Sequence, residues 1–275
     1  MRGTVLYKMT GSGNDFVMLD GRTTRAERWP AERVRAVCDR RHGVGADGMV
    51  ILTPEGSGVV RMGFWNSDGS RAAMCGNAAL CCARLAVHLE MTEPGELCLH
   101  TDAGAVRARA DLADEQAEIN LPDVALPAPV PGLVPQAGER WLEFGTVGVP
   151  HLIVRVNDVE AVDLPGRGRA LRHDSHLGPE GANVNFVSPP RAAGGPWLIR
   201  TYERGVEGET LACGTGTVAS AVALAAHEEA TLPLRFQSRG GPELLVRATL
   251  GEGRASDLWL GGQGRLLFRA VWEGR

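Results

Sequence analysis

Two cysteines stand in nearly the same sequence context and are the residues best suited to chemistry. Cys75 lies in the stretch MCGN and Cys213 in ACGT, and each has an aromatic residue, Phe64 or Tyr202, 11 positions earlier. A run rich in alanine, leucine and valine follows each Cys-Gly pair, which predicts a helix that begins at the cysteine. We therefore expect two thiols at the starts of two helices.

The start of a helix favours negative charge, because its first N–H groups are unpaired and its dipole is positive there. A cysteine at that place is expected to have its thiolate favoured, with a pKa below the usual value of about 8.5. The same N–H groups can hold a substrate carboxylate. Two such thiols on opposite faces of one carbon would invert it, because one thiolate removes a proton and the opposing thiol delivers one.

The alternative for either cysteine alone is a small core residue beside a tight turn, since free cysteine is often buried. The repeated context favours chemistry over that alternative. A redox pair is a second alternative, but the long separation and the lack of a CxxC pair argue against it. Of the remaining cysteines, Cys81, Cys82 and Cys98 are expected in the core, and Cys38 lacks the further ligands that a metal site needs.

The chain also repeats itself over longer distances. The two cysteines are 138 residues apart, and two weaker similarities keep nearly the same offset. Residues 13–17 resemble residues 148–152 at an offset of 135, and residues 45–47 resemble residues 181–183 at an offset of 136. Three similarities in the same order indicate a duplicated domain.

Short apolar runs separated by glycine and aspartate turns predict strands in each half. In the first half they are Val5–Met9, Phe16–Leu19, Met49–Leu52, Arg61–Trp65, Leu97–His100, Ala105–Ala110 and Ala117–Leu121. A shorter helix is expected at about Pro30–Arg40, and Leu121–Pro135, with five prolines, as the connection between domains. The predicted fold class is α+β: two pseudo-symmetric lobes from an internal duplication, each with many short strands wrapped around a central helix.

Composition excludes several classes of function. Lys8 is the only lysine among 29 basic residues, which argues against pyridoxal phosphate chemistry and against a GxxxxGK phosphate loop. The net charge is −4 and the pI about 6.0, so neither nucleic acid nor an anionic membrane surface is indicated. No stretch of about 18 apolar residues occurs, and the N-terminus has no apolar signal region, which predicts a cytoplasmic protein.

Two further motifs do not indicate binding sites. Residues 43–48 fit the pattern GxGxxG but precede a strand-like run, whereas a dinucleotide site needs a helix there. Residues 173–176, with two histidines and an aspartate, are interpreted as a solvated polar loop and not as a metal site.

The chain resembles the diaminopimelate epimerase family over nearly its full length. The matching stretches are KMTGSGNDFVMLDG, RRHGVGADG, FWNSDGSRAAMCGNAA, GVPH, ANVNF and YERGVEGETLACGTG. The resemblance implies a cytoplasmic isomerase that interconverts LL- and meso-diaminopimelate in lysine biosynthesis, without metal or organic cofactor, and forms a homodimer. We expect one lobe at residues 1–120, with 264–275 returning to it, a second at 121–263, and the active site in the cleft between them.

The resemblance also implies roles for single residues. Cys75 and Cys213 are the acid–base pair, and His151 lies beside the site, where it helps to position or deprotonate a cysteine. The residues implied in binding the small-molecule substrate are Asn14, Asn66, Gly76, Asn77, Asn183, Glu203, Arg204, Gly214 and Thr215. Among these, the Cys-Gly segments supply backbone cradles for the α-carboxylate, Arg204 pairs with the distal carboxylate and Glu203 with an amino group.

The chain departs from the family pattern at three places. Val149 replaces a frequent asparagine, Gly48 replaces a frequent glutamine, and the segment GVEGET is one residue longer than usual, for which Glu207 is expected to compensate. These departures leave two alternatives open. One is a racemase for another amino acid, histidine for instance, and the other is a non-catalytic module that binds an amino acid.

Overall fold

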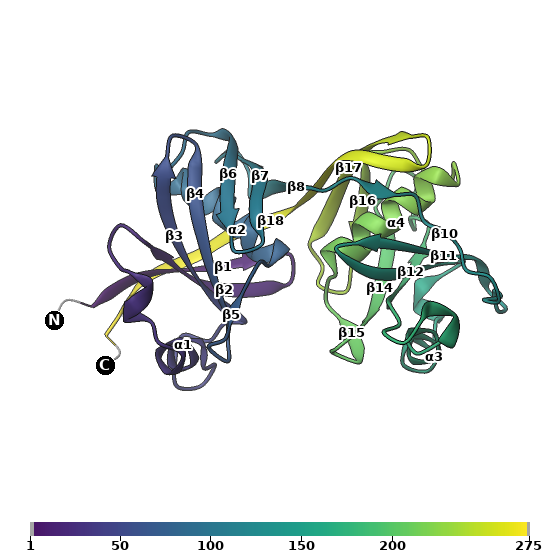
Figure 1. Cartoon of the computed structure of the whole chain (residues 1–275), viewed down its shortest axis with the longest axis horizontal. Coiled ribbons are helices and arrows are strands. Elements are labelled where there is room, and N and C mark those ends of the chain that lie inside the picture. The colour runs from purple at the N-terminus through teal and green to yellow at the C-terminus, as the bar shows by residue number, and fades with distance from the viewer. Residues whose placement is uncertain (1–2, 274–275) are drawn as a thin grey trace. The chain divides into compact units, whose positions relative to one another are not determined.

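A computed structural model describes residues 3–273, whose regular secondary structure consists mostly of strands (Figure 1). The chain divides into two compact units. Unit 1 comprises Met1–Asn120 and Gly261–Arg275, and unit 2 comprises Leu121–Leu260. Each unit has its own helix surrounded by strands.

The described strands of unit 1 close into a barrel. Consecutive pairings run from β1 to β2, β3, β4, β6, β7 and β8, and β18 pairs with both β8 and β1. The strands are β1 Thr4–Gly11, β2 Asn14–Asp20, β3 Gly48–Gly56, β4 Val59–Asn66, β6 Gly95–Thr101, β7 Gly104–Ala110, β8 Gln116–Leu121 and β18 Arg254–Trp272, of which β18 belongs to unit 1 from Gly261 onward. The pairs β2–β3 and β4–β6 are parallel, and the pairs β1–β18, β1–β2, β3–β4, β6–β7 and β7–β8 are antiparallel.

The helix α2, Gly76–His88, packs against the strands of this barrel. Its residues from Ala78 to Val87 are buried except Arg84. A helix that is apolar nearly all round needs cover on every side, which the surrounding strands supply. Its N-terminus is thereby held at a fixed place by the core.

Unit 2 repeats this order of pairing. The strand β11 is antiparallel to β12, β12 is parallel to β13, β13 is antiparallel to β14, β14 is parallel to β16, and β16 is antiparallel to β17. Its elements are β10 Ala128–Pro129, β11 Glu139–Val147, β12 Val149–Val156, β13 Asn183–Ser188, β14 Trp197–Glu203, α4 Gly214–Ala226, β16 Leu234–Gln237 and β17 Glu243–Gly251. The helix α4 packs against β11, β12, β13 and β17.

Short elements complete both units. The two-residue strand β5, Arg71–Ala72, pairs with β4, and β15, Gly208–Thr210, pairs with β14. The remaining helical segments are η1 Ala26–Arg28, α1 Ala31–Cys38, η2 Val159–Ala161, η3 Leu164–Gly168, α3 Arg169–Arg172 and η4 Ser175–Leu177. In the described part of the chain, no helix is long and apolar enough to span a membrane.

Most predicted elements are confirmed. Every strand expected in the first half lies within an observed strand, and helices begin directly after Cys75 and Cys213. The segment 121–135, expected to connect the domains, starts where unit 2 begins and carries two short strands: β9 (Val124–Ala125) pairs with β18, and β10 pairs with β11. Cys81 and Cys82 are buried as expected, whereas Cys98 is only half-buried.

Candidate active site

Cys75 is the N-cap residue of α2. Its backbone is extended, with φ −142° and ψ 121°, so its side chain lies just ahead of the first helical turn. The backbone N–H groups of Ala78 and Asn77 lie near enough to its sulfur to lower the pKa of the thiol, although its side chain makes no capping hydrogen bond. The first-turn donors of the helix, which have no intrahelical acceptor, therefore reach the thiol itself.

The expectation of a lowered thiol pKa is wrong for Cys75. Burial raises its pKa above the usual value, and the nearby N–H groups of Ala78 and Asn77 offset only part of this effect. The carboxylate of Asp47 raises it further. The free energy needed to remove a thiolate from water is larger here than the stabilisation that the helix start provides, because desolvation disfavours the charged form.

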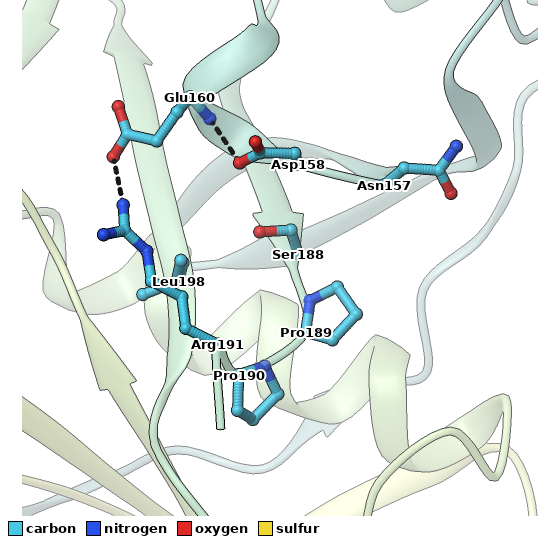
Figure 2. Close-up of a pocket in the computed structure, with 8 residues that line it drawn as sticks. All are labelled: Asn157, Asp158, Glu160, Ser188, Pro189, Pro190, Arg191 and Leu198. Carbon is cyan, nitrogen blue, oxygen red and sulfur yellow. Dashed lines mark hydrogen bonds and ion pairs between the residues drawn. The ribbon is translucent and has the colours of Figure 1, made fainter. Parts of the chain in front are cut away.

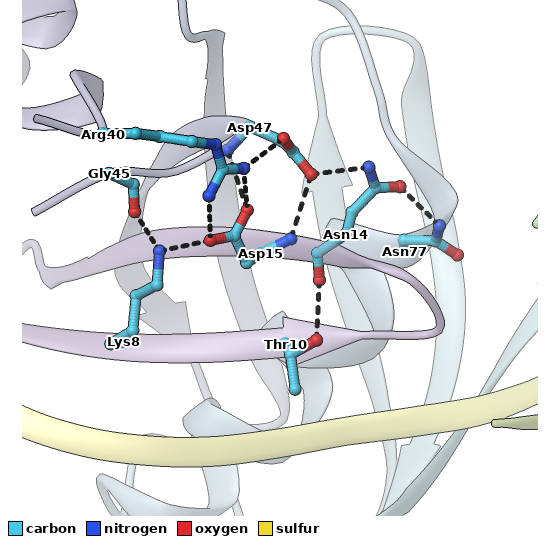
Figure 3. A network of polar contacts seen from close by, with 8 residues as sticks. All are labelled: Lys8, Thr10, Asn14, Asp15, Arg40, Gly45, Asp47 and Asn77. Carbon is cyan, nitrogen blue, oxygen red and sulfur yellow. Dashed lines mark hydrogen bonds and ion pairs between the residues drawn. The ribbon is translucent and has the colours of Figure 1, made fainter. Parts of the chain in front are cut away.

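Asn77 and Asn14 are joined directly in unit 1 (Figure 3). Asn77 Nδ2 donates to Asn14 Oδ1 at 2.8 Å, and Asn14 Nδ2 donates to Asp47 Oδ2 at 2.8 Å. Asp47 accepts only, so the amide of Asn14 must present its nitrogen to Asp47 and its oxygen to Asn77. Two of the predicted binding residues are thus brought together and held in one orientation.

A network of charged side chains holds Asp47, the partner of Asn14, in place (Figure 3). Arg40 bridges Asp15 and Asp47 with nitrogen–oxygen distances of 2.6 Å, and Lys8 Nζ bonds Asp15 Oδ2 at 2.6 Å and the carbonyl oxygen of Gly45. Burial raises the pKa of Asp15, but Arg40 and Lys8 outweigh it and bring the pKa to about 2. The only lysine of the chain is therefore committed to an ion pair.

The turn between β1 and β2 places Asn14. Ser12 and Gly13 both have positive φ, 46° and 107°, between the paired residues Gly11 and Asn14. Two residues at positive φ are typical of the tight hairpin turns that match the twist of the strands. A Cβ on Gly11 would lie 2.5 Å from the carbonyl oxygen of Asn77, so glycine lets the hairpin approach α2.

Asn66 and Gly48 are paired across β4 and β3 in unit 1. Asn66 is exposed at the end of β4, where its side chain donates to Ser70 Oγ at 3.0 Å and not to the Asn14–Asn77 pair. A Cβ on Gly48 would lie 2.7 Å from both Phe64 Cε2 and Trp65 O. This backbone therefore leaves no room at residue 48 for the glutamine that is frequent in the family.

Cys213 occupies the same place in unit 2, the N-cap of α4, with φ −129° and ψ 102°. Burial and then the carboxylate of Glu203 raise its pKa to about 11, against the opposing influence of the Gly216 N–H and the Thr215 hydroxyl. The expectation of a lowered pKa is wrong here for the same reason as for Cys75. Glu203, predicted to meet an amino group, lies close enough to act on this thiol.

His151 and Thr215 are joined beside Cys213. The sulfur lies 3.8 Å from Thr215 Oγ1, which lies 3.0 Å from His151 Nε2. His151 is fully buried, and burial followed by the positive charge of Arg204 lowers its pKa to about 4, against an opposing hydrogen bond with the Val147 backbone. The imidazole is therefore neutral at neutral pH.

Asn183 and Arg204 are also brought together in unit 2. The backbone N–H of Arg204 donates to Asn183 Oδ1 at 2.8 Å. The guanidinium of Arg204 pairs with Glu180 at 3.0 Å, and the Glu180 side chain is 80% exposed. An exposed partner of this kind is readily exchanged for another carboxylate, because surface ion pairs contribute little free energy.

Glu207 anchors the loop that carries these residues. It has a positive φ of 55°, accepts from the N–H of Gly205 at 3.1 Å, and pairs with Arg172 and His173 at 3.1 and 3.2 Å. The ion pairs tie the loop to the end of α3. This supports the expectation that Glu207 compensates for the longer segment.

A separate hollow of about 520 Å³ lies in unit 2 between the end of β12 and the β13–β14 connection (Figure 2). Its lining residues are Asn157, Asp158, Glu160, Ser188, Pro189, Pro190, Arg191 and Leu198. None of them is a predicted site residue, and Glu160 and Arg191 pair with each other at 3.4 Å. This hollow is not the candidate active site.

Within each unit several predicted residues are joined by contacts, Asn14 with Asn77 and Asn183 with Arg204, whereas Asn66 is not, and the sequence reasoning missed residues that hold them. In the described residues, no group of three or more His, Cys, Asp or Glu side chains is placed to hold a metal. The missed residues are Lys8, Asp15, Arg40 and Asp47 in unit 1 and Asn185 and Thr201 in unit 2. A signal existed for Asn185, because it lies two positions after Asn183 in the strand-like run NVNF, and alternate residues of a strand share a face.

Comparison with known proteins gives consistent matches. The sequence model described as diaminopimelate epimerase matches residues 6–121 and 144–249. The diaminopimelate epimerase of Gemmatimonas aurantiaca is 42% identical over 97% of this chain and 98% of its own length. That of Aquifex aeolicus is 39% identical over 78% of this chain and 79% of its own length.

Solved structures with low sequence identity share the fold. A phenazine biosynthesis protein of the PhzF family from Bacillus anthracis matches with a TM-score of 0.70 at 13% identity, over 99% of this chain and 98% of that one. A hydroxyproline epimerase from Agrobacterium vitis, solved with bound trans-4-hydroxy-L-proline, matches with a TM-score of 0.61 at 16% identity, over 98% and 91% of the two chains.

Proposed function

The chain belongs to the diaminopimelate epimerase family, and we propose that Cys75 and Cys213 are the two acid–base groups of its reaction. It is an isomerase that interconverts LL- and meso-diaminopimelate, a step of lysine biosynthesis. One observation carries the proposal. Both cysteines are the N-cap residue of a largely buried 13-residue helix, one in each unit.

The two lobes are, in this proposal, copies of one duplicated unit, with the substrate in the cleft between them. The shared order of strand pairings supports the duplication, including two parallel pairs at the same places in each unit. The proposed lobes are residues 1–120 with 264–275, and residues 121–263. One cysteine then faces each side of the substrate α-carbon.

In the proposed reaction, the thiolate of one cysteine removes the α-proton, and the thiol of the other delivers its proton to the opposite face. The bonding electrons left on the α-carbon delocalise into the carboxylate until the new C–H bond forms. Backbone N–H groups of Gly76 with Asn77, and of Gly214 with Thr215, stabilise the charge that develops on that carboxylate. The two cysteines have exchanged protonation states at the end, which prepares the reverse reaction.

The raised thiol pKa values suit this task. An amino-acid α-proton is weakly acidic, and a thiolate whose conjugate thiol has a pKa of about 11 is a stronger base than an ordinary thiolate. The cost is that little of this thiolate exists at neutral pH. Binding of substrate between buried thiols excludes water, which preserves their basicity.

The remaining predicted residues bind the rest of the substrate. Arg204 exchanges Glu180 for the distal carboxylate, and Glu203 accepts a hydrogen bond from an amino group. Asn14, Asn66 and Asn183 orient the substrate. The scheme uses no metal and no organic cofactor, and Lys8, held by Asp15, does not form a Schiff base. The cytoplasmic location and the homodimer stay predictions.

The experiment is conversion of LL-diaminopimelate by the purified, reduced protein, with the meso isomer resolved by chiral chromatography. L-Histidine, which lacks a distal carboxylate, is the matched comparison. Formation of meso-diaminopimelate without formation of D-histidine supports the proposal. Conversion of histidine alone identifies a racemase for another amino acid. Tight binding of diaminopimelate without loss of its α-proton identifies a binding module.

A further inference from the structure

A line of buried polar side chains leads away from Cys213. Beyond Thr215 and His151, the imidazole Nδ1 lies 3.2 Å from Asn185 Nδ2, and Thr201 Oγ1 donates to Asn185 Oδ1 at 2.9 Å. His151 and Asn185 are 0% exposed and Thr201 is 3% exposed. Nothing in the reaction proposed above requires Asn185 or Thr201.

The orientation of the Asn185 amide follows from its other neighbour. Asn185 Nδ2 lies 3.3 Å from the carbonyl oxygen of Leu152, which can only accept a hydrogen bond. The amide nitrogen must therefore face Leu152 and His151, and the amide oxygen must face Thr201. A Cβ on Gly216 would lie 2.1 Å from that oxygen, so glycine in α4 makes room for this amide.

The amide in turn favours one position of the imidazole proton. An NH₂ group can only donate, so it favours Nδ1 of His151 as the acceptor and the proton of the neutral imidazole on Nε2. The Val147 backbone, whose hydrogen bond raises the pKa of His151, is the competing partner for a ring N–H. Nε2–H donates to Thr215 Oγ1, 3.0 Å away. The hydroxyl hydrogen of Thr215 is left to donate to the sulfur of Cys213 at 3.8 Å.

The fold itself does not need polar side chains at these positions. Asn185 lies two residues after the β13 partner of His151 and pairs with Thr201 on β14. The positions with the same relationship on β2, β3 and β4 of unit 1 carry Phe16, Val50 and Phe64. All three are at most 6% exposed, so apolar residues fill these places well. Burying polar groups there in unit 2 costs free energy, which indicates a role outside folding.

We propose that Asn185 is a positioning residue that holds His151 in the Nε2–H tautomer and so leaves the Thr215 hydroxyl to donate to Cys213. This inference rests on the proposed function of Cys213 as an acid–base group. His151 is then a hydrogen-bond donor that supports the thiolate, and not the base that takes the thiol proton, because Nε2 already carries a proton. Cys75 has no such line, since Asn77 of α2 bonds Asn14 instead.

The first test determines the tautomer of His151 in the unsubstituted protein. Nitrogen-15 NMR of the imidazole in the full-length, reduced protein distinguishes a protonated from an unprotonated ring nitrogen, and His151→Gln assigns the signals. We expect Nε2 to be protonated and Nδ1 unprotonated near pH 7. A proton on Nδ1 would overturn the inference, because Nδ1 would then donate to the Val147 backbone and could not accept a hydrogen bond from Asn185.

The second test reverses the tautomer. Asn185→Asp replaces a donor with a carboxylate that only accepts, which forces the proton onto Nδ1 and makes Nε2 the acceptor of the Thr215 hydroxyl. Cys213 then loses one hydrogen bond to its thiolate. We expect its apparent pKa, from the pH dependence of alkylation measured by mass spectrometry at that residue, to rise by about one unit. We expect kcat to fall about tenfold with KM little changed.

Two controls separate this role from a loss of structure. Ser220→Ala removes another fully buried hydroxyl of α4, which bonds the Gly216 carbonyl oxygen at 2.7 Å, and should leave the pKa of Cys213 unchanged. Asn185→Val copies the residue of unit 1, and should fold and shift that pKa in the same direction as Asn185→Asp. An unchanged alkylation profile in a folded Asn185 variant would overturn the inference.

A double substitution tests the route of the effect. In a Thr215→Val background the link to Cys213 is already broken, so Asn185→Asp should raise the pKa of Cys213 no further. A further rise in the pKa of Cys213 as large as in the single variant would show that Asn185 does not act through His151 and Thr215. The tautomer and alkylation readouts do not need turnover, so they decide this inference even if diaminopimelate proves not to be the substrate.

Discussion

The side-chain amide of Asn77 donates a 2.8 Å hydrogen bond to Oδ1 of Asn14, and this bond joins the first turn of α2 to the start of β2. The amide of Asn14 is fixed in turn by Asp47, which Arg40 holds by an ion pair of 2.6 Å. Cys75 thus stands beside groups whose orientation is set before any substrate arrives. Cys213 is supported differently, by Thr215 and a buried histidine.

Asp47→Asn tests the support of the first half-site. The new amide cannot accept from both Asn14 and Arg40 as two carboxylate oxygens do, so we expect the Asn14 amide to lose its single orientation and KM to rise about tenfold. The carboxylate of Asp47 also raises the pKa of Cys75, so that pKa should fall in the variant. Alkylation rates resolved at Cys75 over a range of pH would measure this, and a rise in the pKa would contradict it.

Cys75→Ala and Cys213→Ala should each abolish epimerisation. Loss of one acid–base group costs about 10² to 10⁴ in rate, and here either loss leaves one face of the carbon without a proton donor or acceptor. Removing a sulfur from a helix N-cap should leave the fold intact, which circular dichroism checks. Cys98→Ala, a half-buried cysteine on β6, is the matched control and should keep its activity. Near wild-type turnover by either single variant would disprove the scheme.

The pH dependence follows from the raised thiol pKa values. Burial raises the pKa of Cys75, and burial and then Glu203 raise that of Cys213 to about 11. In the free enzyme near pH 7 both groups are therefore almost entirely thiols, whereas the reaction needs one thiolate. We expect kcat/KM to increase close to tenfold per pH unit from about pH 6 to about pH 8, because the thiolate fraction does so below the pKa. A profile that is flat or falls over this range would mean that the thiolate is already formed.

Arg204 should determine recognition of the distal carboxylate. Arg204→Met is expected to raise KM for diaminopimelate by about tenfold or more, because a charge-assisted hydrogen bond is lost. Glu180→Gln is the matched control, since it removes only the exposed carboxylate that pairs with Arg204 at 3.0 Å. That variant should bind substrate at least as well as the wild type. Equal KM values for the Arg204 variant and the wild type would place the distal carboxylate elsewhere.

The sequence allowed the helix starts and the strands to be predicted because both are periodic and local. Cys75 and Cys213 have the same neighbours in sequence and the same place in the structure. The direction of the thiol pKa shifts was predicted wrongly, because it depends on how deeply the sulfur is buried, and burial is set by strands far away in the chain. The helix start does act on each sulfur, but with the smaller effect.

The contacts that hold the site together were the least predictable part. Lys8, Asp15 and Arg40 form one network although they are spread over more than 30 residues, and no periodic pattern links them. Asn185 lies within the stretch ANVNF, where Asn183 was singled out instead. The alternation of side chains along β13 puts both asparagines on the same face, and that alternation is a signal available from sequence.

The central claim is that two different groups exchange the α-proton, and isotope incorporation tests it most directly. LL-diaminopimelate is incubated with reduced protein in D₂O and analysed by proton NMR and mass spectrometry at low conversion. The account predicts that the meso product carries deuterium at the inverted carbon while the remaining LL substrate keeps its hydrogen, because the thiol that delivers is not the thiolate that removed. Deuterium in recovered LL substrate at the rate of product formation would show a single exchanging base and contradict the account.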